Sequence, residues 1–222
     1  MELLKDFLDF FLHLDKHLFT LIQEYGTWIY VILFLIIFAE TGLVVIPFLP
    51  GDSLLFAAGT FCAGVTTNGQ HAELNLFIVL LLLIVAAILG DALNYFIGKT
   101  IGSKVIRWKI GKRQLINQKY IDQTHDFFNK HGSKAIVIAR FVPIVRTFAP
   151  FVAGIGNMKY FTFLRFNILG GLAWVLGLTL LGYFFGNLEI VKENFEIVIF
   201  GIIFLSLLPM LFEFLKARKK YN

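Results

Sequence analysis

The chain has 222 residues, of which 58% are hydrophobic and 16% charged, and it contains 26 phenylalanines. A soluble domain of this length needs a larger charged fraction to cover its surface, so composition argues against a soluble globular protein. Several apolar runs approach or exceed the roughly 20 residues that cross a bilayer as a helix. The formal net charge is +5, and in a membrane protein the placement of basic residues matters more than their sum. We therefore expect an all-α integral membrane protein.

The N-terminal segment 1–26 is predicted to be an amphipathic helix at the membrane interface. Its polar residues recur every three to four positions from Glu2 to Glu24, and Leu and Phe residues occupy the other face. Five acidic residues interrupt the apolar ones, and no basic start leads to a small-residue cleavage site. The sequence therefore predicts no cleavable signal peptide.

The first long apolar run begins at residue 27 and is broken after Glu40. It continues through Pro47 and Pro50 to Gly51 and Asp52. Prolines and a glycine inside an apolar run break a helix. We therefore predict a re-entrant helical hairpin over about 44–62, in which Pro47, Pro50 and Gly51 are the breaking positions.

The middle of the chain alternates apolar and polar segments. A polar loop at 63–75 precedes a predicted span at 76–98. Residues 99–134 then hold nine Lys or Arg against two Asp. Apolar residues at helical spacing between Leu115 and Phe128 predict a second amphipathic helix within this basic loop.

A second broken apolar segment covers 135–155. It contains Arg140, Pro143, Arg146 and Pro150, so it is predicted to be a second re-entrant hairpin with breaks at the two prolines. Two further spans and a basic tail follow, at 163–186, 197–215 and 216–222.

The basic segments predict the topology. The loop 99–134 and the tail 216–222 are both rich in Lys and Arg, so both should lie in the cytoplasm. Two cytoplasmic ends require an even number of crossings, yet three apolar segments separate them. We therefore expect 135–155 to enter from the cytoplasm and return there. The same reasoning places loop 63–75 outside and, if 44–62 is also re-entrant, the N-terminus in the cytoplasm.

A faint internal repeat relates the two halves. Residues 56–59 (Phe-Ala-Ala-Gly) resemble 151–154 (Phe-Val-Ala-Gly), and 95–98 (Tyr-Phe-Ile-Gly) resemble 183–186 (Tyr-Phe-Phe-Gly). Each half thus has a broken hairpin and a span that ends in Tyr-Phe-x-Gly. Hairpins entering from opposite faces make this a pseudo inverted repeat, an architecture common among transporters.

Four charged residues fall within the broken segments: Glu40, Asp52, Arg140 and Arg146. Each costs roughly 2.5–3.5 kcal/mol at the centre of a lone membrane helix, so they must pair or line a wet cavity. Two interpretations stay open. In one, acid–arginine pairs tie the two hairpins together; in the other, the arginines bind a phosphate and the acids carry protons.

Five polar residues in or beside the spans are further candidates to line a cavity: Asp91, Asn94, Tyr95, Thr147 and Asn167. Asp91 and Asn94 share a helix face, with Tyr95 beside them. Hydrogen bonding between helices is the alternative for these side chains. The single cysteine, Cys62, is expected to be a packed residue, and all five histidines lie outside the spans and hairpins. We therefore predict no metal site and no cofactor.

Three motifs resemble those of the DedA family, also called the SNARE-associated or VTT-domain family. They are Glu40 followed by Pro47 and Pro50-Gly51-Asp52, then Gly90-Asp91-x-x-Asn94-Tyr95, and Ala139-Arg140-Phe141-x-Pro143-x-x-Arg146. The resemblance extends over nearly the whole chain, with no departure at the charged positions. It implies two re-entrant hairpins that face each other. It also implies that the functional acids and arginines correspond to Glu40, Asp52, Arg140 and Arg146.

The family resemblance also implies a function. Members are inner-membrane proteins implicated in envelope integrity and in processes that depend on the proton-motive force. Bacterial members are linked to returning undecaprenyl phosphate to the cytoplasmic leaflet, and others to flipping or scrambling phospholipids such as phosphatidylethanolamine. The sequence is therefore expected to encode a flippase of the bacterial inner membrane, with Arg140 and Arg146 binding phosphate and Glu40 and Asp52 coupling to protons.

Three other classes of function fit the sequence less well. A lipid phosphatase requires a nucleophile and an acid/base group, and the histidines lie in the wrong segments, so no enzymatic activity is predicted. A proton-coupled exporter of small cations suits the acids but not the arginines. A structural membrane protein without transport is the remaining alternative. The expected partners are membrane lipids and protons, with no nucleic acid, and homo-oligomerisation stays open.

By residue number, the expected organisation has three parts: 1–26, the interfacial helix; 27–215, the membrane transport domain; and 216–222, the basic cytoplasmic tail.

Overall fold

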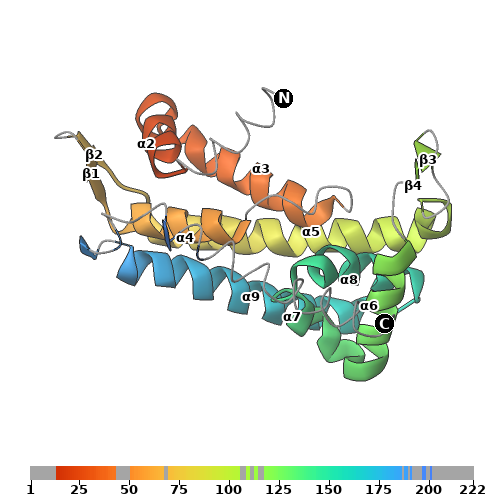
Figure 1. The fold of residues 1–222 in the computed structure, drawn as a ribbon. Helices are drawn as coiled ribbons and strands as arrows, with labels where there is room; N and C mark the ends of the chain where they lie inside the picture. The colour runs from red at the N-terminus through yellow and green to blue at the C-terminus, as the bar shows by residue number, and fades with distance from the viewer. Residues whose placement is uncertain are drawn as a thin grey trace, which may run out of the picture. The chain divides into compact units, whose positions relative to one another are not determined.

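The computed structural model describes residues 14–43, 51–67, 70–105, 109–110, 113–114 and 118–186, with the isolated positions 188–189, 191, 197–198 and 201. The described chain is mostly helical, with two short antiparallel hairpins (Figure 1). In chain order the elements are α2 (Leu14–Tyr25), α3 (Trp28–Gly42), α4 (Gly51–Cys62), β1 (Val65–Thr67), β2 (Gln70–Ala72), α5 (Leu76–Val105), β3 (Lys109–Ile110), β4 (Arg113–Gln114), α6 (Gln118–His131), η1 (Gly132–Lys134), α7 (Ala135–Ala139), α8 (Pro143–Ile155) and α9 (Tyr160–Phe185).

Contacts between residues divide the chain into two compact units. Unit 1 comprises 1–36, 50–83 and 175–206, and unit 2 comprises 37–49, 84–174 and 207–222. The boundaries fall inside α3, α5 and α9, so each of these helices contributes to both units.

Two helices have the length and composition of membrane spans, namely Leu76–Gly102 within α5 and Tyr160–Phe185. They correspond to the predicted spans 76–98 and 163–186. The apolar part of α3 is shorter, at 15 residues. The predicted span 197–215 lies outside the described residues, except for positions 197, 198 and 201.

The all-α prediction omitted two short hairpins. Strand β1 pairs with β2 through Val65↔Ala72 and Thr67↔Gln70, inside the predicted polar loop. Strand β3 pairs with β4 through Lys109↔Gln114, inside the basic loop. Runs of only two or three residues carry too little period-two alternation to predict strands from the sequence.

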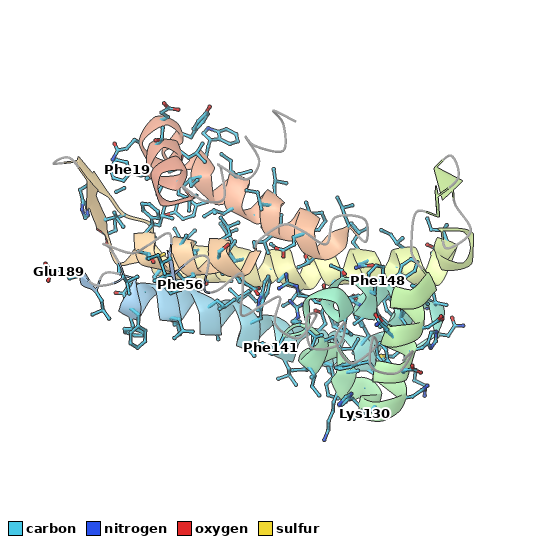
Figure 2. The ribbon with its side chains drawn as sticks, in the orientation of Figure 1. Phe19, Phe56, Lys130, Phe141, Phe148 and Glu189 are labelled. Atoms are coloured by element: carbon cyan, nitrogen blue, oxygen red, sulfur yellow. The ribbon has the colours of Figure 1, made fainter. Side chains whose placement is uncertain are left out.

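The two predicted amphipathic helices appear as α2 and α6. Residues 1–13 lie outside the described part, and α2 buries Leu18 while exposing Gln23 and Glu24. Helix α6 buries Ile121 against Phe148, Phe151 and Val152 of α8 and turns charged residues outward. Phe148 of this cluster is labelled in Figure 2. The alternation of apolar and charged residues therefore predicted the buried face of α6.

The second broken segment consists of two helices joined by a turn. Helix α7 ends before Arg140, and Val142 is extended, with φ −122° and ψ 102°, before Pro143 opens α8. A proline disfavours helical geometry in the residue before it and is well suited to the first helical position. Pro150, also predicted to break the chain, instead lies inside α8, which continues to Ile155. A proline inside a helix removes its own N–H from the ladder and crowds the carbonyl four residues earlier, but α8 continues past it.

The first predicted hairpin is described only from Gly51 onward. Pro47 and Pro50 lie outside the described residues, and Gly51 begins α4. Asp52 is half-buried in the first turn of that helix, where a carboxylate interacts favourably with the helix dipole. Every other residue of α4 is buried, including Cys62.

In unit 1, α4 packs closely on the end of α9. A Cβ at Gly182 would lie 1.9 Å from the Phe56 carbonyl oxygen, and one at Gly59 would lie 2.0 Å from that of Thr179. Such distances are possible only for glycine, because the two backbones touch there. The Thr60 hydroxyl donates to the Phe56 carbonyl at 3.2 Å and lies 3.4 Å from that of Gly182.

In unit 2, α8 packs on the end of α5 in the same manner. A Cβ at Gly98 would lie 2.1 Å from the Phe151 carbonyl oxygen, and one at Gly154 would lie 2.2 Å from that of Tyr95. The Tyr95 ring is fully buried, stacks on Phe163 with centroids 4.6 Å apart, and donates its hydroxyl to the Met158 carbonyl at 2.5 Å. Tyr95 is therefore a packing residue in this unit.

Candidate functional site

A buried charged cluster occupies unit 2, and it is built around two arginines. Arg140 lies in the turn after α7, and Arg146 lies in the first turns of α8, six residues later. The break at Pro143 separates the two residues, so that they reach different acids. The Arg140 side chain is 2% exposed and that of Arg146 is 10% exposed.

Arg140 binds two side-chain oxygen atoms through a single nitrogen, which also lies 3.5 Å from the Ala87 carbonyl oxygen. Its Nη2 donates to Oδ2 of Asp91 and to Oδ1 of Asn167, each at 2.6 Å. The Asp91 side chain is only 5% exposed. Burial makes this ion pair costly to break, because one charge would then remain uncompensated.

Arg146 pairs with the other acid of the cluster. Its Nη2 donates to Oε1 of Glu40 at 2.6 Å, and the Glu40 side chain is 2% exposed. Glu40 lies near the end of α3, and its partner is 106 positions away in the sequence. This contact joins an acid of the first broken segment, at the end of α3, to an arginine of the second.

A tryptophan faces both guanidinium groups. The Cζ of Arg140 is 5.7 Å and that of Arg146 is 5.0 Å from the ring centroid of Trp174. Both distances lie within the range of a cation–π interaction. Trp174 is 1% exposed, so the ring excludes water from this side of the arginines.

Asn94 holds two backbone segments together beside the ion pairs. Its Nδ2 donates to the Thr41 carbonyl at 3.2 Å and to the Thr147 carbonyl at 2.9 Å. Asn94 thereby ties the ends of α3 and α8 to α5, close to Glu40 and Arg146. This favours interhelical bonding over cavity lining as its role.

The cluster contains five of the predicted site residues, namely Arg140, Arg146, Glu40, Asp91 and Asn167. Asp52 lies in the first turn of α4, is assigned to unit 1 and has interactions of its own. Thr147 is buried and contributes its carbonyl to Asn94. Among the residues that the structure describes, no group of three or more His, Cys, Asp or Glu is arranged to hold a metal ion.

Sequence reasoning missed Trp174, Gly170 and Gly171. A Cβ at Gly170 would lie 3.0 Å from Cδ of Arg140, and one at Gly171 would lie 3.6 Å from its Nη2. The two glycines therefore let α9 approach the guanidinium closely. A signal was present, since 167, 170, 171 and 174 follow the i, i+3, i+4, i+7 spacing of a single helix face.

Two long apolar helices, with ion pairs buried among the helices, are typical of a helical integral membrane protein with a polar interior site. Comparison with known proteins shows the family to which this chain belongs. The family model for the VTT domain matches residues 46–184. The chain therefore belongs to the VTT-domain family, also called the DedA family.

Individual relatives agree with this assignment. The chain is 50% identical over 219 residues to Protein DedA of Escherichia coli (strain K12), covering 99% of this chain and 97% of that protein. It is 43% identical over 177 residues to Uncharacterized membrane protein Rv0364 of Mycobacterium tuberculosis (strain ATCC 25618 / H37Rv), covering 80% and 74%. It is 38% identical over 161 residues to Inner membrane protein YqjA of Escherichia coli (strain K12), covering 72% and 68%. No solved structure matches the chain.

Proposed function

We propose that this protein is a lipid translocase, which moves a lipid with a phosphate headgroup between the leaflets of the bacterial inner membrane. Undecaprenyl phosphate is the first candidate, and a phospholipid such as phosphatidylethanolamine is the second. The proposed partners are thus membrane lipids and protons. The inner-membrane location is supported by the relative named Inner membrane protein YqjA.

The incomplete hydrogen bonding of Arg140 carries the proposal. Its Nε and Nη1 are buried and have no hydrogen-bond partner among the described residues. A guanidinium has five N–H donors, of which three belong to these two nitrogens. Buried donors are nearly always satisfied, so an anion with several acceptor oxygens is a suitable ligand for them. A phosphate offers that chemistry.

The acids provide a means of releasing that anion. Glu40 and Asp91 each occupy a nitrogen of an arginine, so a phosphate that binds the same guanidinium must compete with them. Protonation weakens a carboxylate as a competitor, which couples binding of the phosphate to protons. We propose that Asp52, in unit 1, also takes part in proton coupling.

The lipid tail is proposed to remain in the bilayer while the headgroup moves. Each methylene removed from an apolar environment costs about 0.8 kcal/mol, so a long tail is best left in hydrocarbon. Guanidinium groups bind anions, and carboxylates gain and lose protons. Transport therefore suits the cluster better than covalent catalysis does.

The packing within each unit supports the internal repeat. In unit 1, Phe56 of α4 meets Gly182, and in unit 2, Phe151 of α8 meets Gly98. Gly186 likewise meets Thr60, as Gly102 meets Ile155. By these contacts, Gly98 corresponds to Gly182 and Gly102 corresponds to Gly186. The internal repeat in the sequence instead paired Gly98 with Gly186, so the two alignments differ by one helical turn. We propose that the two hairpin–span pairs are halves of an inverted repeat.

Reconstitution tests the proposed activity directly. Purified protein in liposomes should accelerate movement between leaflets of undecaprenyl phosphate or of a phospholipid, measured separately for each leaflet. The rate should change with a pH gradient, because carboxylates compete for the arginines. Movement no faster than in empty liposomes, for every phosphate lipid and at every gradient, would refute the translocase.

Cysteine labelling tests the proposed topology. The native cysteine is first removed by Cys62→Ala. In that background, single cysteines introduced by Lys119→Cys or Lys219→Cys should react with an impermeant thiol reagent only from the cytoplasmic side. Asn68→Cys should react only from outside, because the basic segments are retained in the cytoplasm. Labelling of positions 119 and 219 from opposite faces would show that 135–155 crosses the membrane and is not re-entrant.

A further inference from the structure

Two different oxygen atoms share one nitrogen of Arg140. Oδ2 of Asp91 and Oδ1 of Asn167 both lie 2.6 Å from Nη2. An Nη2 carries two hydrogens, and these two short contacts account for them, while the Ala87 carbonyl oxygen lies farther from Nη2, at 3.5 Å. One acceptor belongs to a group that gains and loses a proton, and the other belongs to a neutral amide.

Asn167 is fixed in its orientation by a second hydrogen bond. Its Nδ2 donates to the Ile88 carbonyl at 3.0 Å, so that Oδ1 faces Arg140. Asn167 is 0% exposed, and the adjacent glycines at 170 and 171 bring its helix close to the guanidinium. The interaction of this amide with Arg140 does not depend on pH.

The charges around Asp91 define its electrostatic setting. Among the described residues, the charged groups that interact with the Asp91–Arg140 pair are Arg146 and Glu40. Two guanidinium groups and two carboxylates give the cluster a formal charge of zero. A proton on Asp91 raises that charge to +1, which favours an anion.

We propose that Asp91 competes with the anion for Arg140 in a proton-dependent manner. Asn167 is then a positioning residue that keeps Arg140 in place when protonated Asp91 no longer accepts its ionic hydrogen bond. This inference rests on the proposed binding of an anion by the arginines. When a proton binds to Oδ2 of Asp91, the ionic hydrogen bond from Nη2 is lost. That donor then joins Nε and Nη1 in binding the anion, while Asn167 still accepts from Nη2.

The fluorescence of Trp174 can report this binding. The full-length protein has three tryptophans, and Trp28→Phe with Trp108→Phe leaves only the one beside both arginines. In this background the purified protein is titrated with dimethyl phosphate between pH 5 and pH 8.5. Dimethyl phosphate keeps a single negative charge across this range, so any pH dependence of the affinity belongs to the protein.

The affinity of the parent protein should fall as the pH rises, because ionised Asp91 competes for Nη2. At pH 8, Asp91→Asn should bind about tenfold more tightly than the parent, since one charge-assisted hydrogen bond no longer has to be displaced. The pH dependence should also become flatter. Asn167→Asp should weaken binding at pH 8, because a second carboxylate then holds Nη2. The part of the pH dependence due to Glu40 is identified by repeating each titration with Glu40→Gln.

Exchanging the carboxylate and the amide between positions 91 and 167 tests whether the pH dependence requires a carboxylate on Nη2 of Arg140. The double variant Asp91→Asn with Asn167→Asp keeps one carboxylate and one amide on Nη2, so it remains informative even if Asp91→Asn does not fold. Its pH dependence should return, with a midpoint at higher pH, because a protonated carboxyl at position 167 can donate to the Ile88 carbonyl. A swap that lacks pH dependence would overturn the inference.

Two further outcomes are distinguishable. If the parent binds dimethyl phosphate but Asp91→Asn keeps the same pH dependence, Asp91 is not the competitor and the anion site still stands. If the parent shows no response at any pH, the proposed anion site and this inference both fail.

Discussion

Arg140→Lys and Arg146→Lys should each lower lipid transport in liposomes by about tenfold to a hundredfold, which corresponds to one charge-assisted hydrogen bond. Lysine keeps the charge but loses the planar arrangement of donors. At position 140 it cannot both hold Asp91 and Asn167 and present donors to a phosphate. At position 146 it loses the guanidinium whose Cζ lies over the Trp174 ring, 5.0 Å from its centroid. Both variants should still accumulate in the membrane.

Arg165→Lys is the matched control for these substitutions. Arg165 is exposed and lies on α9, two residues before Asn167. Its replacement should leave transport and accumulation unchanged. If both buried lysine variants disappear from the membrane while Arg165→Lys accumulates normally, the ion pairs are structural and the arginines are not a binding site.

Glu40→Gln and Asp52→Asn should accumulate but lose the response to a pH gradient.

Gly98→Ala and Gly182→Ala should each destabilise the protein by about 3 kcal/mol or more, a large effect for adding one methyl group. A Cβ at these positions would lie 2.1 Å and 1.9 Å from backbone carbonyl oxygens of α8 and α4, respectively. A carbonyl cannot move aside as the end of a flexible side chain can. The helices must therefore separate. Gly98→Ala loosens the contact between α5 and α8 in unit 2, and Gly182→Ala loosens the contact between α9 and α4 in unit 1. Thermal unfolding in detergent measures the loss.

Gly177→Ala is the control for this pair, on the same helix as Gly182. No described atom lies within 4 Å of a Cβ at Gly177. Alanine favours a helix over glycine by up to about 1 kcal/mol, so this variant should be neutral or slightly more stable. If all three alanine variants unfold at the same temperature as the parent, the close backbone contacts do not hold the helices together.

The two expected effects concern different aspects of the same design. Glycine contacts bring the helices of each unit close enough to exclude lipid, and within unit 2 that closeness buries the arginines. Burial then makes the choice of anion consequential, because an unpaired charge in an apolar setting is strongly disfavoured. A lysine substitution changes a charged side chain and leaves the glycine contacts in place, whereas an alanine substitution changes a glycine contact and leaves the charged side chains in place.

Much of the fold follows from local patterns in the sequence. The apolar runs predicted α5 and α9 because a span needs a minimum length of apolar residues. Proline chemistry predicted the break before Pro143, since both the extended Val142 and the helix start depend only on neighbouring residues. The same rule failed at Pro150, where packing of α8 on its neighbours maintains the helix.

The charged residues of the site were also evident from the sequence, because ionisable side chains are expensive in apolar segments. Their pairing was not. The sequence suggested acids of the first broken segment as partners for both arginines, whereas Arg140 instead binds Asp91 of α5 and Asn167 of α9. Trp174 faces both guanidinium groups, and nothing in its immediate sequence indicates that role.

The sequence by itself thus determined which residues must be hidden from lipid, since that depends on the chemistry of each side chain. Only the tertiary structure decided which of them meet, because the contacts join positions 27 to 106 residues apart and depend on how closely the helices approach.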